Sequence, residues 1–127
     1  MENRSSVLLI FTGGTISMGE NSSNHSLAPL DTKQVLSFIP ELQMLNVNIA
    51  SVSFSPLIDS SDIQPSNWIE IGHHIETHYN DFDGFVVLHG TDTMAYSAAA
   101  LSFMLDGLRK PVIFTGSQLP VGVLRSD

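Results

Sequence analysis

Short, unbroken apolar segments separated by stretches with helical spacing constrain the fold of this chain more than any other feature. Residues 7–11, 84–88 and 111–114 are continuous apolar runs, and residues 47–54 form a fourth segment rich in branched and aromatic side chains. Continuous runs of this length are typical of parallel strands that are buried on both faces. We therefore predict a strand at each of the four segments.

The stretches between these segments indicate helices. Apolar side chains recur at helical spacing in residues 31–39, 65–79 and 93–105. The side chains expected to face inward are Val35, Leu36 and Ile39 in the first, Trp68, Ile71, Gly72, Ile75 and Tyr79 in the second, and Met94, Ala98, Leu101, Met104 and Leu105 in the third. Strands alternating with helices predict a doubly wound α/β fold, a parallel sheet with helices on both faces. Residues 17–30, rich in Asn and Ser, are predicted to form a mobile loop of the kind that closes over a site.

Composition limits the possible partners and compartments. With 127 residues the chain is long enough for one domain, and its 13 acidic against 5 basic side chains give a net charge of −8. This balance argues against nucleic acid and against a basic membrane-binding surface. The absence of cysteine excludes disulfides and a cysteine nucleophile. The apolar run at residues 7–11 is too short for a secretory signal or a membrane span, so we expect a cytoplasmic protein without a membrane partner.

The predicted strands all lead into small or polar turns. These turns read TGGT at residues 12–15, DSSD at 59–62, HGTDT at 89–93 and TGSQ at 115–118, and none of them contains a basic residue. Open parallel sheets bind their ligands beyond the carboxyl ends of the strands. We therefore expect the functional site at this edge.

Phosphate or metal could in principle occupy such an edge. The glycine turn at residues 12–15 lacks the further glycines, and the lysine, that dinucleotide and P-loop sites require. His73, His74 and His78 offer imidazoles, and the last two are four residues apart on one predicted helix face. The metalloprotease pattern needs Glu where this chain has Ile75, and histidines on such a face are more often plain surface residues.

A hydroxyl nucleophile is the remaining interpretation. Thr15 directly follows a glycine turn, and Thr91 is followed by Asp92 at the predicted start of a helix, where main-chain N–H groups could stabilise an oxyanion. Each of these residues taken alone could equally be a turn or N-cap residue. Two such turns on separate strands favour a site.

These residues carry a resemblance to a known family. TGGTI at residues 12–16 and HGTDTM at 89–94 resemble the two signature motifs of bacterial-type L-asparaginases. DSSD at 59–62 and MAY at 94–96 are more similar to the cytoplasmic type I branch than to the exported one. Further similarity, at residues 84–87 and 110–118, extends the resemblance over nearly the whole chain.

The resemblance implies hydrolysis of L-asparagine to L-aspartate and ammonia without metal or organic cofactor. By the match, Thr15 would be the nucleophile that forms an acyl-enzyme, and Thr91 with Asp92 would form the second catalytic group. The residues that would hold the α-amino and α-carboxylate ends of the substrate are Asp59, Ser60, Ser61, Thr91 and Asp92, and Ser117 would lie near the substrate amide.

This chain also differs from the family pattern. The loop at residues 17–30 lacks the family's tyrosine, since the only tyrosines are Tyr79 and Tyr96, and neither Lys33 nor Lys110 matches the family's catalytic lysine. Family members are more than twice as long, form dimers or tetramers, and carry a C-terminal domain that completes a neighbour's site. We therefore expect residues 1–127 to be the front part of the N-terminal domain, without the C-terminal domain and inactive alone.

Two other functions remain open at this stage. One is the related subunit of tRNA-dependent amidotransferases, which carries the same two motifs, and the other is a non-catalytic amino-acid-binding module. Glutamine is a possible second substrate, because a single methylene is worth only about 1–3 kcal/mol in a pocket.

Overall fold

The computed structural model describes residues 4–20, 27–29 and 31–119, and its centre is a four-stranded parallel sheet. The strands are β1 (Ser5–Phe11), β4 (Val47–Ser53), β5 (Gly84–Leu88) and β6 (Val112–Thr115), arranged in the order β4-β1-β5-β6. All neighbouring pairs in this sheet are parallel. The four predicted strands are confirmed, with ends that differ from the prediction by no more than two residues.

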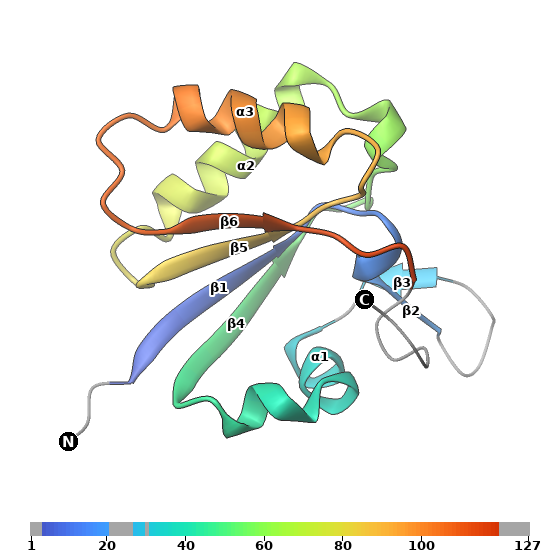
Figure 1. The fold of residues 1–127 in the computed structure, drawn as a ribbon, viewed down its shortest axis with the longest axis vertical. Coiled ribbons are helices and arrows are strands. Elements are labelled where there is room, and N and C mark those ends of the chain that lie inside the picture. The colour runs from blue at the N-terminus through green and yellow to red at the C-terminus, as the bar shows by residue number, and fades with distance from the viewer. Residues whose placement is uncertain (1–3, 21–26, 30, 120–127) are drawn as a thin grey trace.

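Helices cover both faces of the sheet. α1 (Thr32–Phe38) lies against one face, and α2 (Pro65–Thr77) and α3 (Met94–Met104) lie against the other (Figure 1). α1 begins at a capping box, in which Gln34 N donates to Asp31 Oδ1 at 2.8 Å and Asp31 N donates to Gln34 Oε1 at 2.9 Å. The predicted doubly wound α/β fold is confirmed.

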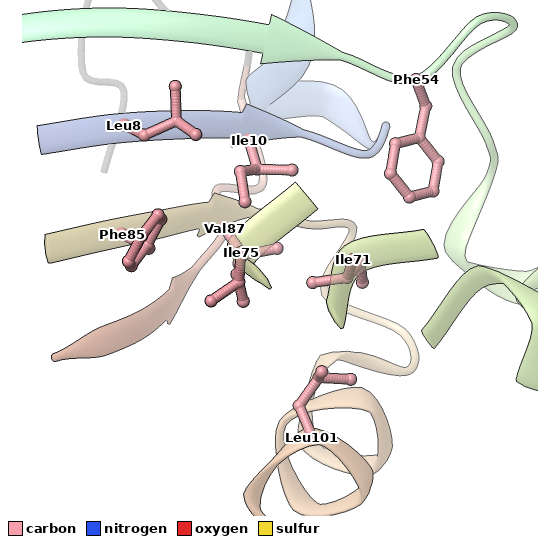
Figure 2. Packing of buried hydrophobic residues seen from close by; sticks show 8 residues of the cluster. All are labelled: Leu8, Ile10, Phe54, Ile71, Ile75, Phe85, Val87 and Leu101. Carbon is pink, nitrogen blue, oxygen red and sulfur yellow. The ribbon is translucent and has the colours of Figure 1, made fainter. Parts of the chain in front are cut away.

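The alternation of side chains along β1 explains why its apolar run is continuous. Leu8 and Ile10 pack toward α2 and α3 in a cluster shown in Figure 2, whereas Leu9 and Phe11 belong to a second cluster that includes Val35 of α1. The members of the first cluster are Leu8, Ile10, Phe54, Ile71, Ile75, Phe85, Val87 and Leu101. Both faces of β1 are therefore covered, as the sequence predicts.

The inward-facing residues of α3 differ in part from the prediction. Leu101 and Ser97 are buried, but Met104 is 44% exposed. Met104 is the last residue of α3 and borders an open groove between α2 and α3, which leaves much of its side chain accessible to solvent. The expectation that Met104 belongs to the buried stripe is wrong.

The stretch predicted as a loop contains regular structure. β2 (Met18–Glu20) and β3 (Leu27–Pro29) pair antiparallel, with Met18 opposite Pro29. A prediction of irregular structure throughout residues 17–30 is therefore wrong, because backbone pairing forms a short hairpin there without an apolar run to signal it. Residues 21–26 and 30 of the expected lid lie outside the described residues. In the described part of the chain, no helix is long and apolar enough to cross a bilayer.

Candidate active site

The carboxyl ends of the four parallel strands lie in register. Phe11 is paired with Ser53 on one side and with Leu88 on the other, and Leu88 is paired with Thr115. From β1 the chain passes to β4 on one side, and it then returns across β1 to β5 on the other side. The turns after β1 and β5 therefore flank the switch point of the sheet, which is where doubly wound folds bind their ligands.

Two glycines bring the turns of this edge into direct contact. Gly14 has φ +76°, and a methyl group built on it would lie 2.4 Å from Gly90 Cα. A methyl group built on Gly90 would lie 2.5 Å from Ser60 Oγ. The turns after β1, β4 and β5 thus meet at a point where no side chain fits between them. Thr15 and Thr91 each follow a glycine of this contact.

The turn after β1 holds Thr15 at the start of a short 3-10 helix, η1 (Thr15–Ser17). Ser17 secures this turn, because its hydroxyl donates to Gly13 O at 2.7 Å and its main-chain N–H donates to Gly14 O at 3.1 Å. Thr15 is half-buried. The hydroxyl-bearing side chain expected to act as nucleophile therefore lies on a hydrogen-bonded turn at the switch point.

The turn after β4 presents an ionised carboxylate. Asp59 precedes the 3-10 helix η3 (Ser60–Asp62), and its Oδ1 accepts from Ser61 N at 3.0 Å and from Ser61 Oγ at 2.9 Å. The main-chain hydrogen bond, followed by the hydroxyl, lowers the pKa of Asp59 below its ordinary value. Asp59 is exposed and Ser60 is buried, so this turn offers a solvent-facing negative charge.

The turn after β5 carries Thr91 and Asp92 immediately before α3. Thr91 is half-buried and Asp92 is exposed. Thr93, the N-cap residue of α3, donates its hydroxyl to Ser60 O at 2.7 Å instead of capping its own helix. Sequence reasoning missed this link between the two turns, because a threonine at a helix start is ordinarily interpreted as a cap.

A buried chain of polar groups lies behind this turn. His89 Nδ1 is 2.6 Å from Gly90 O, and because a carbonyl oxygen only accepts, we assign the proton to Nδ1. His89 Nε2 then accepts from Ser97 Oγ at 2.8 Å, and Ser97 Oγ accepts from Trp68 Nε1 at 2.9 Å. Burial lowers the pKa of His89, which keeps the imidazole neutral. No sequence pattern indicated this link between β5, α3 and α2.

The turn after β6 reaches the same site. Gln118 Nε2 donates to Thr91 Oγ1 at 2.9 Å. Ser117 is buried, and its hydroxyl contacts the main chain of Leu119, from which it accepts an N–H at 3.1 Å. The structure therefore brings Gln118, for which the sequence predicted no role, onto an expected catalytic residue. The adjacency of the β5 and β6 ends could have indicated this contact.

The histidines considered as metal ligands and Lys110 lie outside the turns at the carboxyl ends of the strands. The rings of His74 and His78 stack on α2 with centroids 6.3 Å apart, and among the residues described here no group of three or more His, Asp or Glu side chains could hold a metal ion. Lys110 Nζ donates to Phe82 O at 2.6 Å and also to Tyr79 O. These contacts lie just before the starts of β5 and β6, at the edge of the sheet opposite the turns described above.

Comparison with known proteins agrees with this geometry. Residues 6–127 match the family model described as Asparaginase, N-terminal. L-asparaginase 1 of Escherichia coli is 46% identical over 125 residues, which are 98% of this chain and 37% of that protein. The crystal structure of L-asparaginase I from Vibrio cholerae superposes with a TM-score of 0.84 at 44% identity, over 98% of this chain and 37% of that one.

A relative with a different name is more distant. A glutamyl-tRNA(Gln) amidotransferase subunit from Metallosphaera sedula is 38% identical over 114 residues, 88% of this chain and 26% of that protein. The chain thus spans little more than a third of the length of the asparaginases it matches. Strand order, the turns at the switch point and the family model agree, and the chain belongs to the asparaginase N-terminal domain family.

Proposed function

We propose that the protein containing this chain is an amidohydrolase that converts L-asparagine to L-aspartate and ammonia. The observation that carries the proposal is the contact between Gly14 and Gly90, which places Thr15 and the pair Thr91 and Asp92 on adjoining turns at the switch point. Nucleophilic catalysis by a hydroxyl needs such a neighbouring polar group.

The proposed chemistry begins at Thr15. Its Oγ attacks the side-chain carbonyl carbon of the substrate, the hydroxyl proton passes to the leaving amide nitrogen, and ammonia departs from a tetrahedral intermediate. Water then attacks the resulting ester and releases aspartate, which restores the Thr15 hydroxyl. Thr91 and Asp92 form the group that assists proton transfer, and Asp92 also contacts the α-amino group of the substrate. These steps use hydroxyl, carboxylate and water, and the proposal includes no cofactor.

Recognition of the amino acid is assigned to the turn after β4. The α-ammonium group of the substrate requires an ionised acceptor, and Asp59 is exposed with a lowered pKa. Ser60 and Ser61 lie in the same turn, and they are assigned to the α-carboxylate end of the substrate. Thr91 and Asp92, in the turn after β5, complete the proposed set of substrate-binding residues.

The whole protein is proposed from the same resemblance. Residues 1–127 would supply the front part of the N-terminal domain, and a C-terminal domain would come from sequence beyond them. We further propose a cytoplasmic location, on the similarity of residues 59–62 and 94–96 to the type I branch, and a homodimer or homotetramer, as the resemblance to the family implies. The greater length of the relatives supports the proposal that a C-terminal domain comes from further sequence.

An amidotransferase subunit is the second candidate function, because the Metallosphaera sedula relative carries that name. A non-catalytic amino-acid-binding module on the same scaffold is the third. Ammonia release from free L-asparagine in the absence of tRNA would support the first function over both of these.

The decisive experiment compares Thr15→Ala with the parent protein in full length. Loss of the nucleophile should lower kcat by about 1,000-fold or more while aspartate still binds. Thr77→Ala, at the exposed end of α2, is the matched control and should keep parental turnover. Undiminished ammonia release by Thr15→Ala would contradict the assignment, and a parent without turnover would favour the binding module. Turnover by the 127-residue chain alone would refute its expected inactivity.

A further inference from the structure

We propose that Gln118 is a positioning residue that, together with Gly116, holds the Thr91 side chain in one rotamer. The inference deepens the proposed function and rests on it, because it assigns a task to the turn after β6. Thr91 is the expected catalytic group, and Gln118 is its hydrogen-bond partner from the turn after β6.

The parallel pairing of β5 and β6 creates the contact. Leu88 pairs with Thr115, and His89 N donates to Thr115 O at 2.9 Å, so the two strands end side by side. Thr91 and Gln118 each lie three residues beyond this paired row. The turn after β6 is thereby held over the turn that carries Thr91.

Two groups of this turn restrict the same torsion angle. A methyl group built on Gly116 would lie 3.1 Å from Thr91 Cγ2 and 2.5 Å from His89 O, so the Gly116 backbone lies close against the threonine methyl. Gln118 Nε2 donates to Thr91 Oγ1 at 2.9 Å. The methyl and the hydroxyl share one Cβ, and fixing both selects one of three staggered positions of χ1.

The direction of the hydrogen bond between Gln118 and Thr91 determines whether the Thr91 hydroxyl can still donate its proton. Gln118 donates through its amide N–H, so Thr91 Oγ1 accepts and keeps its own proton for another partner. The same donation stabilises negative charge on the oxygen when that proton leaves. Gln118 thus prepares Thr91 for proton transfer.

The test measures kcat and KM for asparagine with the full-length protein. Gln118→Leu removes the donor, and kcat should fall roughly three- to tenfold, as expected for one neutral hydrogen bond, while KM changes less than about twofold. Gln118→Glu can only accept, and it should lose at least as much. Gln43→Leu is the matched control, since its amide donates to Leu36 O on the α1 side of the sheet, and it should behave as the parent.

A double variant separates positioning from simple damage. Thr91→Ser keeps the hydroxyl but removes the methyl contact, so adding Gln118→Leu should lower kcat by more than the product of the two single losses. Three results would each overturn the proposal: a loss of kcat in the double variant equal to the product of the two single losses, an unchanged kcat in Gln118→Leu, or full activity in Gln118→Glu.

An activity-independent measurement distinguishes this inference from the proposed function. Three-bond couplings to the Thr91 methyl carbon report χ1, and they should indicate one rotamer in the parent and averaging in Gln118→Leu. Averaged couplings in the parent would refute the positioning role. A parent that does not hydrolyse asparagine yet shows a single rotamer would refute the proposed function and leave the Gln118 contact established.

Discussion

Asp59 shows how a single exposed side chain is kept charged at this edge. Its carboxylate accepts two hydrogen bonds from Ser61, one from the main chain and one from the hydroxyl, and these lower its pKa. Because the folded-state pKa is depressed, the contacts persist as pH falls through the ordinary range of aspartic acid. They are lost only when pH falls through the lowered pKa.

Replacing Ser61 by Ala should move this titration. The variant loses the hydroxyl hydrogen bond and keeps the main-chain one, so the pKa of Asp59 should rise part of the way toward its ordinary value. A carboxyl-carbon NMR titration measures the shift, and Ser66→Ala, on an exposed residue of α2, should leave the Asp59 titration unchanged. An Asp59 pKa that stays in place in Ser61→Ala would contradict the assigned cause.

For single residues, the sequence predicts which side chains lie at the carboxyl edge of the sheet but not which of them form hydrogen bonds with one another. Thr15, Thr91, Asp92 and Asp59 follow strand ends, and parallel pairing alone places them at one edge. The hydrogen bond of Thr93 to Ser60 O depends on how far each turn extends, which no spacing rule supplies.

Among the elements, α2 depends on a lysine from a distant segment. Lys110 Nζ donates to Phe82 O at 2.6 Å and to Tyr79 O, and it lies 4.8 Å from the centroid of the Tyr79 ring. A cation near carbonyls at a helix C-terminus is favoured by the helix dipole. The strand β6 is thereby connected at its start to the turn between α2 and β5.

Lys110→Met should therefore destabilise the protein. The methylene stem is largely kept, but the carbonyls of Tyr79 and Phe82 lose a charged donor, and the free energy of unfolding should fall by about 1.5–3 kcal/mol. Urea denaturation followed by circular dichroism measures this change. The exposed Lys33 of α1 provides the control, because Lys33→Met should change stability by less than about 0.5 kcal/mol. Equal stability of Lys110→Met and the parent would show that the contact contributes little.

Periodicity predicted the elements well where one face of each is apolar. The inward residues of α2 agree with prediction because Ile71 and Ile75 are buried against the sheet. α3 is apolar on every side, so its pattern could not tell Leu101, which is buried, from Met104, which is exposed. The hairpin of β2 and β3 was missed because main-chain pairing, without an apolar run, defines it.

For the whole molecule, the surface around α3 and β6 has an unusual character. α3 has no charged residue between Met94 and Met104 in a chain of net charge −8, and Phe103 is 89% exposed. β6 pairs with β5 on one side and with no other strand among the described residues, and its Ile113 is 56% exposed. Such a surface is typical of a region that further protein covers, which supports the proposal of a longer parent.

The isolated chain of residues 1–127 should self-associate through this edge. Exposed edge strands with apolar side chains pair with other copies, and a lysine on the edge opposes this pairing. Ile113→Lys should raise severalfold the concentration at which light scattering detects oligomers. Ile69→Lys, on the exposed side of α2, should have a smaller effect, and equal effects of the two variants would argue against association through β6.

The contact between Gly14 and Gly90 has a consequence for how the proposed site tolerates change. Since main chain meets main chain there, the distance between the turns that carry Thr15 and Thr91, the two threonines expected to be catalytic, follows from the spacing of β1 and β5, about 4.8 Å between neighbouring strands, more than from the Thr15 and Thr91 side chains. Substitutions that repack the core should leave the distance between β1 and β5 unchanged. A two-residue slip of β5 along β1 would instead displace Thr91 by about 6.6 Å and abolish the proposed site.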